Sequence, residues 1–143
     1  MKSTFLILLT LLETISFAQN LKCEDFRNGT FTIENTSPIK MNGKLIRNGS
    51  EQYEIYAELP AAYKGLGLEN KPVYGKLEWI DDCSYQMTYD EVKNELMDSE
   101  KLINSLGGIR TELVKIEGNC FYYKSSVKFK ESDMVFYGII CKQ

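Results

Sequence analysis

The sequence contains no histidine among its 143 residues. Histidine is the base of Ser-His-Asp and Cys-His catalytic sites and the commonest metal ligand in proteins, so these sites are excluded. The chain also lacks a cluster of basic residues, and its formal net charge is −3. Nucleic acids and anionic membrane surfaces attract basic proteins, so we predict neither as a partner.

Long apolar runs are also missing, since a membrane-spanning helix needs about 20 consecutive apolar residues. The most apolar run, Phe5 to Leu12, follows Lys2 and precedes the small-residue site Ser16-Phe17-Ala18. This order is typical of a secretory signal peptide. We therefore predict a signal peptide over residues 1–18 and no membrane span. Residues 19–143 then form a single secreted β domain, located in the periplasm or outside the cell.

The chain has four cysteines, Cys23, Cys83, Cys120 and Cys141, all beyond the predicted signal peptide. An even number of cysteines in an exported chain predicts disulfides. A zinc site is the alternative, but its ligands usually come in pairs about two to four residues apart, and these cysteines are scattered singly. A lipid anchor on Cys23 is not expected, because Lys22 stands where a lipoprotein signal has a small residue. We predict two disulfides and neither metal nor cofactor.

The segment Lys76–Tyr89, KLEWIDDCSYQMTY, has apolar residues at alternate positions on both sides of Asp81-Asp82. Period-two alternation around a polar turn predicts a β-hairpin with one buried face. That face carries Trp79 and Tyr85, so we expect the hairpin to lie near the centre of the core.

Similar alternation predicts six further strands, at Gly29–Glu34, Lys44–Arg47, Ser50–Glu58, Thr111–Ile116, Cys120–Phe129 and Met134–Cys141. Asn48-Gly49 is the strongest turn signal, because this pair readily adopts the positive φ angles of a type I′ turn. Tight pairing about it places Ile46, Tyr53, Ile55 and Ala57 on one face, which we expect to be buried.

Two segments do not fit strands. Asp90–Leu106 has helical spacing, with Asp90 as the N-cap and Gly107-Gly108 as the stop, although the apolar pattern breaks near Asp98. Pro60–Pro72 has no periodicity and predicts a long loop, which is uncommon unless the loop covers a cavity, binds something or is mobile.

The last two hairpins predict specific pairings. The Gly118-Asn119 turn sets Val114 and Ile116 beside Tyr123 and Phe121. The next turn pairs Phe121 with Ile140 and Val127 with Met134, which sets Cys120 opposite Cys141; a register shifted by two residues leaves these cysteines one diagonal apart. We therefore predict that Cys120 bonds Cys141 and that Cys23 is left to bond Cys83.

The predicted fold is mainly β: an antiparallel meander of about eight strands curled into a lipocalin-like barrel or half-barrel, with one helix between the fifth and sixth strands. A two-sheet sandwich is the alternative. A barrel of eight strands can hold one small ligand or be filled by its own side chains, and the small size of this chain favours a filled core. If a cavity exists, its predicted lining is aromatic: Phe31, Tyr53, Trp79, Tyr85, Phe121, Tyr123 and Phe136.

Carboxylates are the remaining candidates for catalysis, because a pair of them can hydrolyse glycosides. Glu78, Asp81 and Asp82 lie close together in the sequence. Adjacent residues at a strand turn usually point apart into solvent, so we interpret these as a polar hairpin tip and do not predict an enzyme.

Several short motifs occur in a characteristic order: Cys23-Glu24-Asp25-Phe26, Asn28-Gly29-Thr30-Phe31, Ile46-Arg47, Gln52-Tyr53-Glu54, Trp79-Ile80-Asp81-Asp82-Cys83-Ser84-Tyr85, and Gly118-Asn119 before Tyr122-Tyr123. With this order the chain resembles a family of small exported proteins from flavobacteria and their relatives, which has no assigned activity. Some members carry a DNA topoisomerase label. Strand passage requires a basic DNA-holding surface and a large multidomain protein, whereas this chain is small and acidic.

These observations predict an exported, soluble, non-enzymatic domain that acts as a binding or structural protein of the bacterial envelope. The alternative is a lipocalin-like carrier of a small apolar ligand. The corresponding partners are another envelope protein or that ligand.

Overall fold

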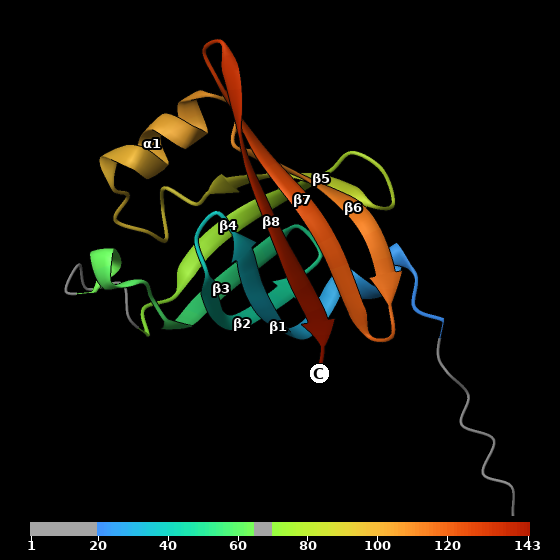
Figure 1. Cartoon of the computed structure of the whole chain (residues 1–143). Coiled ribbons are helices and arrows are strands. Elements are labelled where there is room, and N and C mark those ends of the chain that lie inside the picture. Colours follow the sequence, from blue (N-terminus) through green and yellow to red (C-terminus); the bar gives the residue numbers. More distant parts are fainter. Residues whose placement is uncertain (1–19, 65–69) are drawn as a thin grey trace, which may run out of the picture.

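The computed structural model describes residues 20–64 and 70–143. Its eight strands form a closed antiparallel barrel in which each strand pairs with its neighbours in sequence and β8 closes against β1 (Figure 1). This arrangement confirms the predicted meander and excludes the two-sheet sandwich. The elements are η1 (Cys23–Phe26), β1 (Asn28–Ser37), β2 (Met41–Asn48), β3 (Glu51–Glu58), η2 (Ala61–Tyr63), β4 (Val73–Trp79), β5 (Ser84–Tyr89), α1 (Asp98–Ser105), β6 (Ile109–Glu117), β7 (Cys120–Phe129) and β8 (Ser132–Lys142).

The predicted signal peptide, residues 1–18, lies outside the described residues, as do residues 65–69 of the predicted loop. Before this gap, the loop contains the short 3₁₀ helix η2, which its sequence did not indicate. Among residues 20–64 and 70–143, no helix is both long and apolar enough to cross a membrane.

The turns fix the register as predicted at two hairpins. Gly49 has a φ of 63°, and Asn48 pairs with Glu51 across the β2–β3 turn. In the last hairpin, Phe121 pairs with Ile140 and Cys120 with Cys141. A disulfide joins that cysteine pair.

The second disulfide joins Cys23 to Cys83, whose Cα atoms are 5.0 Å apart. Both bridges are those that the sequence predicted. Cys23 opens η1, so this bridge fastens the N-terminal 3₁₀ helix to the segment between β4 and β5. A cluster of fully buried side chains fills the adjoining end of the barrel: Phe26, Phe31, Leu45, Phe121 and Ile140.

A β-bulge changes the predicted register of the β6–β7 hairpin. Ile116 pairs with Phe121 as predicted, but Leu113 takes the place of Val114 opposite Tyr123, and Lys115 pairs with Tyr122. The extra residue of a bulge is left without a partner, and here that residue is Val114, which is 60% exposed. The prediction that Val114 lies beside Tyr123 is therefore wrong.

The helix is shorter than predicted and starts at Asp98 instead of Asp90. The Asp90 carboxylate does accept hydrogen bonds from the amides of Val92 and Lys93, but it caps an isolated turn. The break in the apolar pattern marks the true start, where the Glu100 carboxylate accepts a 2.8 Å hydrogen bond from the Met97 amide. Gly107 and Gly108 follow the helix with φ of 95° and 90°, as predicted for its stop.

Helix α1 stands outside one end of the barrel, the same end as the turn that joins β7 and β8 (Figure 1). Asn104 attaches it to β5 through two hydrogen bonds, a 2.8 Å bond from the Tyr89 amide and a 2.9 Å bond to the Tyr89 carbonyl. The barrel is thus filled at the η1 end and is covered from outside at the α1 end.

Candidate ligand-binding site

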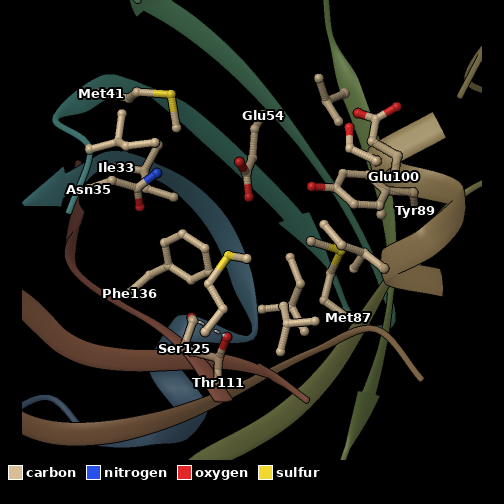
Figure 2. Close-up of a pocket in the computed structure, with 18 of the residues that line it drawn as sticks. Ile33, Asn35, Met41, Glu54, Met87, Tyr89, Glu100, Thr111, Ser125 and Phe136 are labelled. Atoms are coloured by element: carbon tan, nitrogen blue, oxygen red, sulfur yellow. Dashed lines mark hydrogen bonds between the residues drawn. The ribbon is translucent and has the colours of Figure 1, made fainter. Parts of the chain in front are cut away.

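The α1 half of the barrel is hollow. It contains a cavity of about 440 Å³, which is within the size range of small-molecule sites in proteins. Apolar side chains make most of its wall, and Figure 2 shows Ile33, Met41, Met87 and Phe136 around the central space. The expectation that this small barrel fills its own interior is therefore correct for one end and wrong for the other.

The floor and rim of the cavity differ in character. At the floor, the hydroxyls of Thr111 and Ser125 are buried and 2.7 Å apart, so one donates a hydrogen bond to the other (Figure 2). At the rim, α1 and the β7–β8 hairpin contribute apolar side chains that are partly exposed: Met97, Leu102, Phe129 and Met134. Tyr63 of the predicted loop Pro60–Pro72 also lines the cavity, as does Leu59 just before the loop. Of the three roles suggested for this loop, the position of Tyr63 supports that of covering a cavity.

The predicted aromatic lining is correct for three of its seven members. Tyr85, Tyr123 and Phe136 line the cavity. Phe31 and Phe121 face inward but belong to the cluster that fills the opposite end. Both rings pack against the Phe26 ring of η1, with centroid distances of 5.8 Å and 5.2 Å.

Tyr53 and Trp79 do not line the cavity. Tyr53 packs on the outside of the barrel against Tyr74, with ring centroids 5.6 Å apart. Trp79 is only half-buried and packs against Tyr85, and its indole N–H donates a 3.1 Å hydrogen bond to the Gly49 carbonyl. The hairpin does form a core cluster, with Leu77, Tyr85 and Met87 buried, but Trp79 packs at the edge of this cluster because β4 ends at this residue.

The face of the β2–β3 hairpin was also predicted wrongly. Leu45 and Arg47 point into the barrel and are 0% and 3% exposed, so Ile46 points outward. On β3 the inward residues are Gln52, Glu54 and Tyr56, which line the cavity. Apolarity alone favoured the opposite face, but hydrogen bonds between the inward side chains satisfy their polar groups.

These inward side chains form a continuous hydrogen-bonded chain. Arg47 donates from Nε to Gln52 Oε1 at 3.0 Å, and Gln52 Nε2 donates to Glu54 Oε1 at 2.8 Å. The Tyr56 hydroxyl donates to the other oxygen of Glu54. Arg47 also donates to the Phe26 carbonyl at 3.0 Å and to the Tyr85 hydroxyl at 2.5 Å. Each of the three nitrogens of its guanidinium therefore donates a hydrogen bond within the protein.

Burial sets the electrostatics of the cavity. It raises the pKa of the Glu54 carboxyl above its usual value, and the hydrogen bond from Tyr56 and the charge of Arg47 oppose this shift only in part. Burial and the nearby Glu54 also raise the pKa of Tyr56 and Tyr89, and burial raises that of Tyr123. The tyrosines are therefore neutral at physiological pH, and Glu54 is the titratable group in the centre of the cavity.

A second polar group faces Glu54 from the α1 side. Figure 2 shows the Tyr89 hydroxyl pointing into the cavity, with Glu100 beside it at the start of α1. Glu100 is 8% exposed and lines the cavity, while its carboxylate caps the helix. On the opposite wall, the Tyr123 hydroxyl donates a 2.5 Å hydrogen bond to Asn35.

The hairpin-tip carboxylates lie away from this cavity. Asp81 accepts hydrogen bonds from the Cys83 amide and the Ser84 hydroxyl, which lower its pKa. Asp82 is exposed and forms a 3.3 Å ion pair with Arg27. Glu78 is exposed on the outer face of β4, across from Gln86 of β5. In the described part of the chain, no three Cys, Asp or Glu side chains come together as candidate metal ligands.

No protein-family model and no curated protein matches the sequence. Among solved structures, the chain is similar to a redesigned β barrel at 13% sequence identity and a TM-score of 0.38. The match covers 85% of this chain and 96% of that one.

Sequence reasoning missed Gln52, Glu54, Tyr56, Tyr89 and Glu100 as cavity residues. A usable signal was present: Gln52, Glu54 and Tyr56 alternate on β3, so they must share one face of the sheet. Nothing in the local pattern indicated that this polar face is the inner one, because that depends on Arg47, Gln52 and Tyr85 meeting across three strands.

Proposed function

We propose that this protein is a non-enzymatic, exported binding protein that carries a small, mostly apolar ligand inside its barrel. The observation behind this proposal is the cavity of about 440 Å³ at the α1 end. Protein interiors are close-packed, and an unfilled space forfeits the contacts that its walls would otherwise make. A purely structural barrel would gain stability by filling this space, whereas a carrier needs it.

The disulfides support the exported location, because such bonds persist in oxidising compartments such as the periplasm and the extracellular space. The predicted signal peptide over residues 1–18 and the resemblance to small exported flavobacterial proteins support it as well. N-terminal sequencing of the exported protein should begin at Gln19, and a mature protein that retains residues 1–18 would contradict this part of the proposal.

Native mass spectrometry tests the carrier function directly. The protein purified under non-denaturing conditions from its own host should carry an additional small molecule in about one-to-one ratio, which denaturation releases. Repeated isolation of the bare protein would argue for the structural alternative.

A fluorescence titration with the neutral, polarity-sensitive dye prodan tests whether the cavity is the binding site. Val127 is 2% exposed and lines the cavity, whereas Val114 is 60% exposed on the barrel exterior. Val127→Phe should weaken dye binding at least tenfold by filling the cavity, and the matched control Val114→Phe should leave it unchanged. Equal binding by both variants would place the dye elsewhere and refute the proposed site.

A further inference from the structure

The charged groups of the cavity all have the same sign. Its lining includes two carboxylates, Glu54 and Glu100, and no Lys or Arg among the residues that the structure describes. Arg47 is inside the barrel but does not line the cavity, since its three hydrogen-bonding nitrogens are directed to Gln52, Phe26 and Tyr85. An anionic headgroup such as a fatty-acid carboxylate would therefore enter a negative cavity without a cationic partner.

Glu54 keeps acceptor capacity for a ligand. An ionised carboxylate has about four lone-pair sites. Gln52 and Tyr56 each donate one hydrogen bond to it, one per oxygen. Figure 2 shows the carboxylate in the central space of the cavity, with the Tyr89 hydroxyl directed toward it from the other side. A ligand group placed between Glu54 and Tyr89 could donate to the carboxylate while the tyrosine oxygen accepts a further hydrogen bond.

No cation of the described chain forms a direct ion pair with Glu54. Arg47 hydrogen-bonds Gln52, which in turn donates to Glu54, so the Arg47 charge acts on the carboxylate only at longer range. Leaving an ionised carboxylate buried without a paired charge is costly, and a ligand that brings a positive charge removes this cost. Four aromatic rings line the same cavity, those of Tyr56, Tyr85, Tyr89 and Tyr123. A ligand cation that reaches the face of one of these rings would gain a further attraction, which is stronger where water is excluded.

We infer that the ligand is an amphipathic amine whose protonated amino group binds Glu54 and whose apolar body fills the cavity toward the rim formed by α1 and the β7–β8 hairpin. This inference rests on the proposed carrier function and adds the chemical class of the ligand. The apolar rim side chains Met97, Leu102, Phe129 and Met134 match such a body, because the part of the ligand farthest from Glu54 would lie against them.

Isothermal titration calorimetry on the oxidised, secreted protein at pH 7.5 tests the headgroup with three compounds that share one apolar body: 4-phenylbutylamine, 4-phenylbutanol and 4-phenylbutyrate. The amine should bind at least tenfold more tightly than the alcohol, and the acid should bind most weakly. Alcohol or acid binding that equals or exceeds amine binding would overturn the inference while leaving the carrier function intact. If none of the three compounds nor prodan binds, the carrier function itself fails and the inference fails with it.

Two variants locate the headgroup. Glu54→Gln keeps the size of the side chain and removes its charge but leaves an amide oxygen that can accept a hydrogen bond, so it should lower amine affinity at least tenfold and lower alcohol affinity much less. Glu51→Gln is the matched control. Glu51 lies on the same strand as Glu54 but forms an ion pair with Lys93 on the exterior of the barrel, so its substitution should change neither the amine affinity nor the alcohol affinity. Unaltered amine binding by Glu54→Gln would overturn the assignment. Retained alcohol binding shows that the variant is folded, and the comparison of headgroups on the wild-type protein stands even if the variant fails to fold.

Discussion

Loss of the Cys23–Cys83 bridge should destabilise the protein more than loss of the Cys120–Cys141 bridge. The two cross-links close loops with sequence separations of 60 and 21 residues. In the chain-entropy description of disulfides, these separations correspond to about 4.3 and about 3.3 kcal/mol of stabilisation at 25 °C, so the expected difference is about 1 kcal/mol.

The structure enlarges this difference. Cys120 and Cys141 lie directly opposite each other in an antiparallel ladder, so backbone hydrogen bonds hold β7 and β8 together without the bridge. Cys23 instead holds η1, whose Phe26 is fully buried at the filled end of the barrel. Without its bridge, η1 is held on the barrel only by packing and hydrogen bonds, so the Phe26 ring is held less firmly in its buried site. The removal of a buried aromatic side chain costs about 3–5 kcal/mol, which is the upper limit of this additional loss of stability.

Urea unfolding of two double variants measures both effects. Cys23→Ala/Cys83→Ala should lose at least 1 kcal/mol more unfolding free energy than Cys120→Ala/Cys141→Ala, when both are compared with the oxidised wild type. The slope of free energy against urea checks that unfolding stays two-state. Equal losses, or a greater loss for Cys120→Ala/Cys141→Ala, would refute the reasoning from loop length and anchoring. Failure of only the first variant to fold agrees with it.

Three further substitutions test the interior by the same urea assay. Trp79→Ala should lower the free energy of unfolding by about 2–3 kcal/mol. This is less than the loss of about 3–5 kcal/mol for a fully buried aromatic residue, because Trp79 is half-buried against Tyr85. A loss below 1 kcal/mol would mean that the indole is not packed. Glu54→Gln should stabilise the protein at pH 7.5 and have little effect at pH 4. Burial in the folded state raises the pKa of Glu54 above its usual 4.5, so the wild type loses stability as the pH rises above that value. If Glu54→Gln changed stability equally at both pH values, Glu54 would not be a buried charged group. Gly138→Ala should cost about 1–3 kcal/mol, because the added Cβ would lie 2.3 Å from the Tyr123 hydroxyl; a neutral result would show that Tyr123 moves freely.

The fold was predictable where turn chemistry and alternation agree. The Asn48-Gly49 turn leaves little choice of register, and its residues pair as expected. The odd-numbered inward residues of β7 also fix the pairing with β8, including Cys120 opposite Cys141. The β6 bulge was not predictable, because Leu113 and Val114 are both apolar and the sequence does not show which of them leaves the ladder.

The candidate site was less predictable, because its decisive residues are polar side chains on an inner face. Hydrophobic patterning places Tyr53 inside and Glu54 outside, and the opposite is true. The inner position of Glu54 is tolerable only because Gln52 and Tyr56 donate hydrogen bonds to it, and because Arg47 lies beyond Gln52. Gln52 and Tyr56 are neighbours of Glu54 on β3, but Arg47 comes from β2, so the pattern within β3 alone does not reveal which of its faces is the inner one.

The two ends of the barrel therefore differ in the interactions that determine their stability. At the η1 end, the Cys23–Cys83 bridge and a packed phenyl cluster around Phe26 supply stability. At the α1 end, an unfilled cavity and the buried Glu54 carboxylate both reduce it. Replacement of Glu54 by an amide should raise the stability of the empty protein at neutral pH and, if the ligand is an amine, should also abolish its preference for that ligand. One substitution should raise stability and weaken binding at the same time when the charge that it removes binds the ligand but destabilises the folded protein.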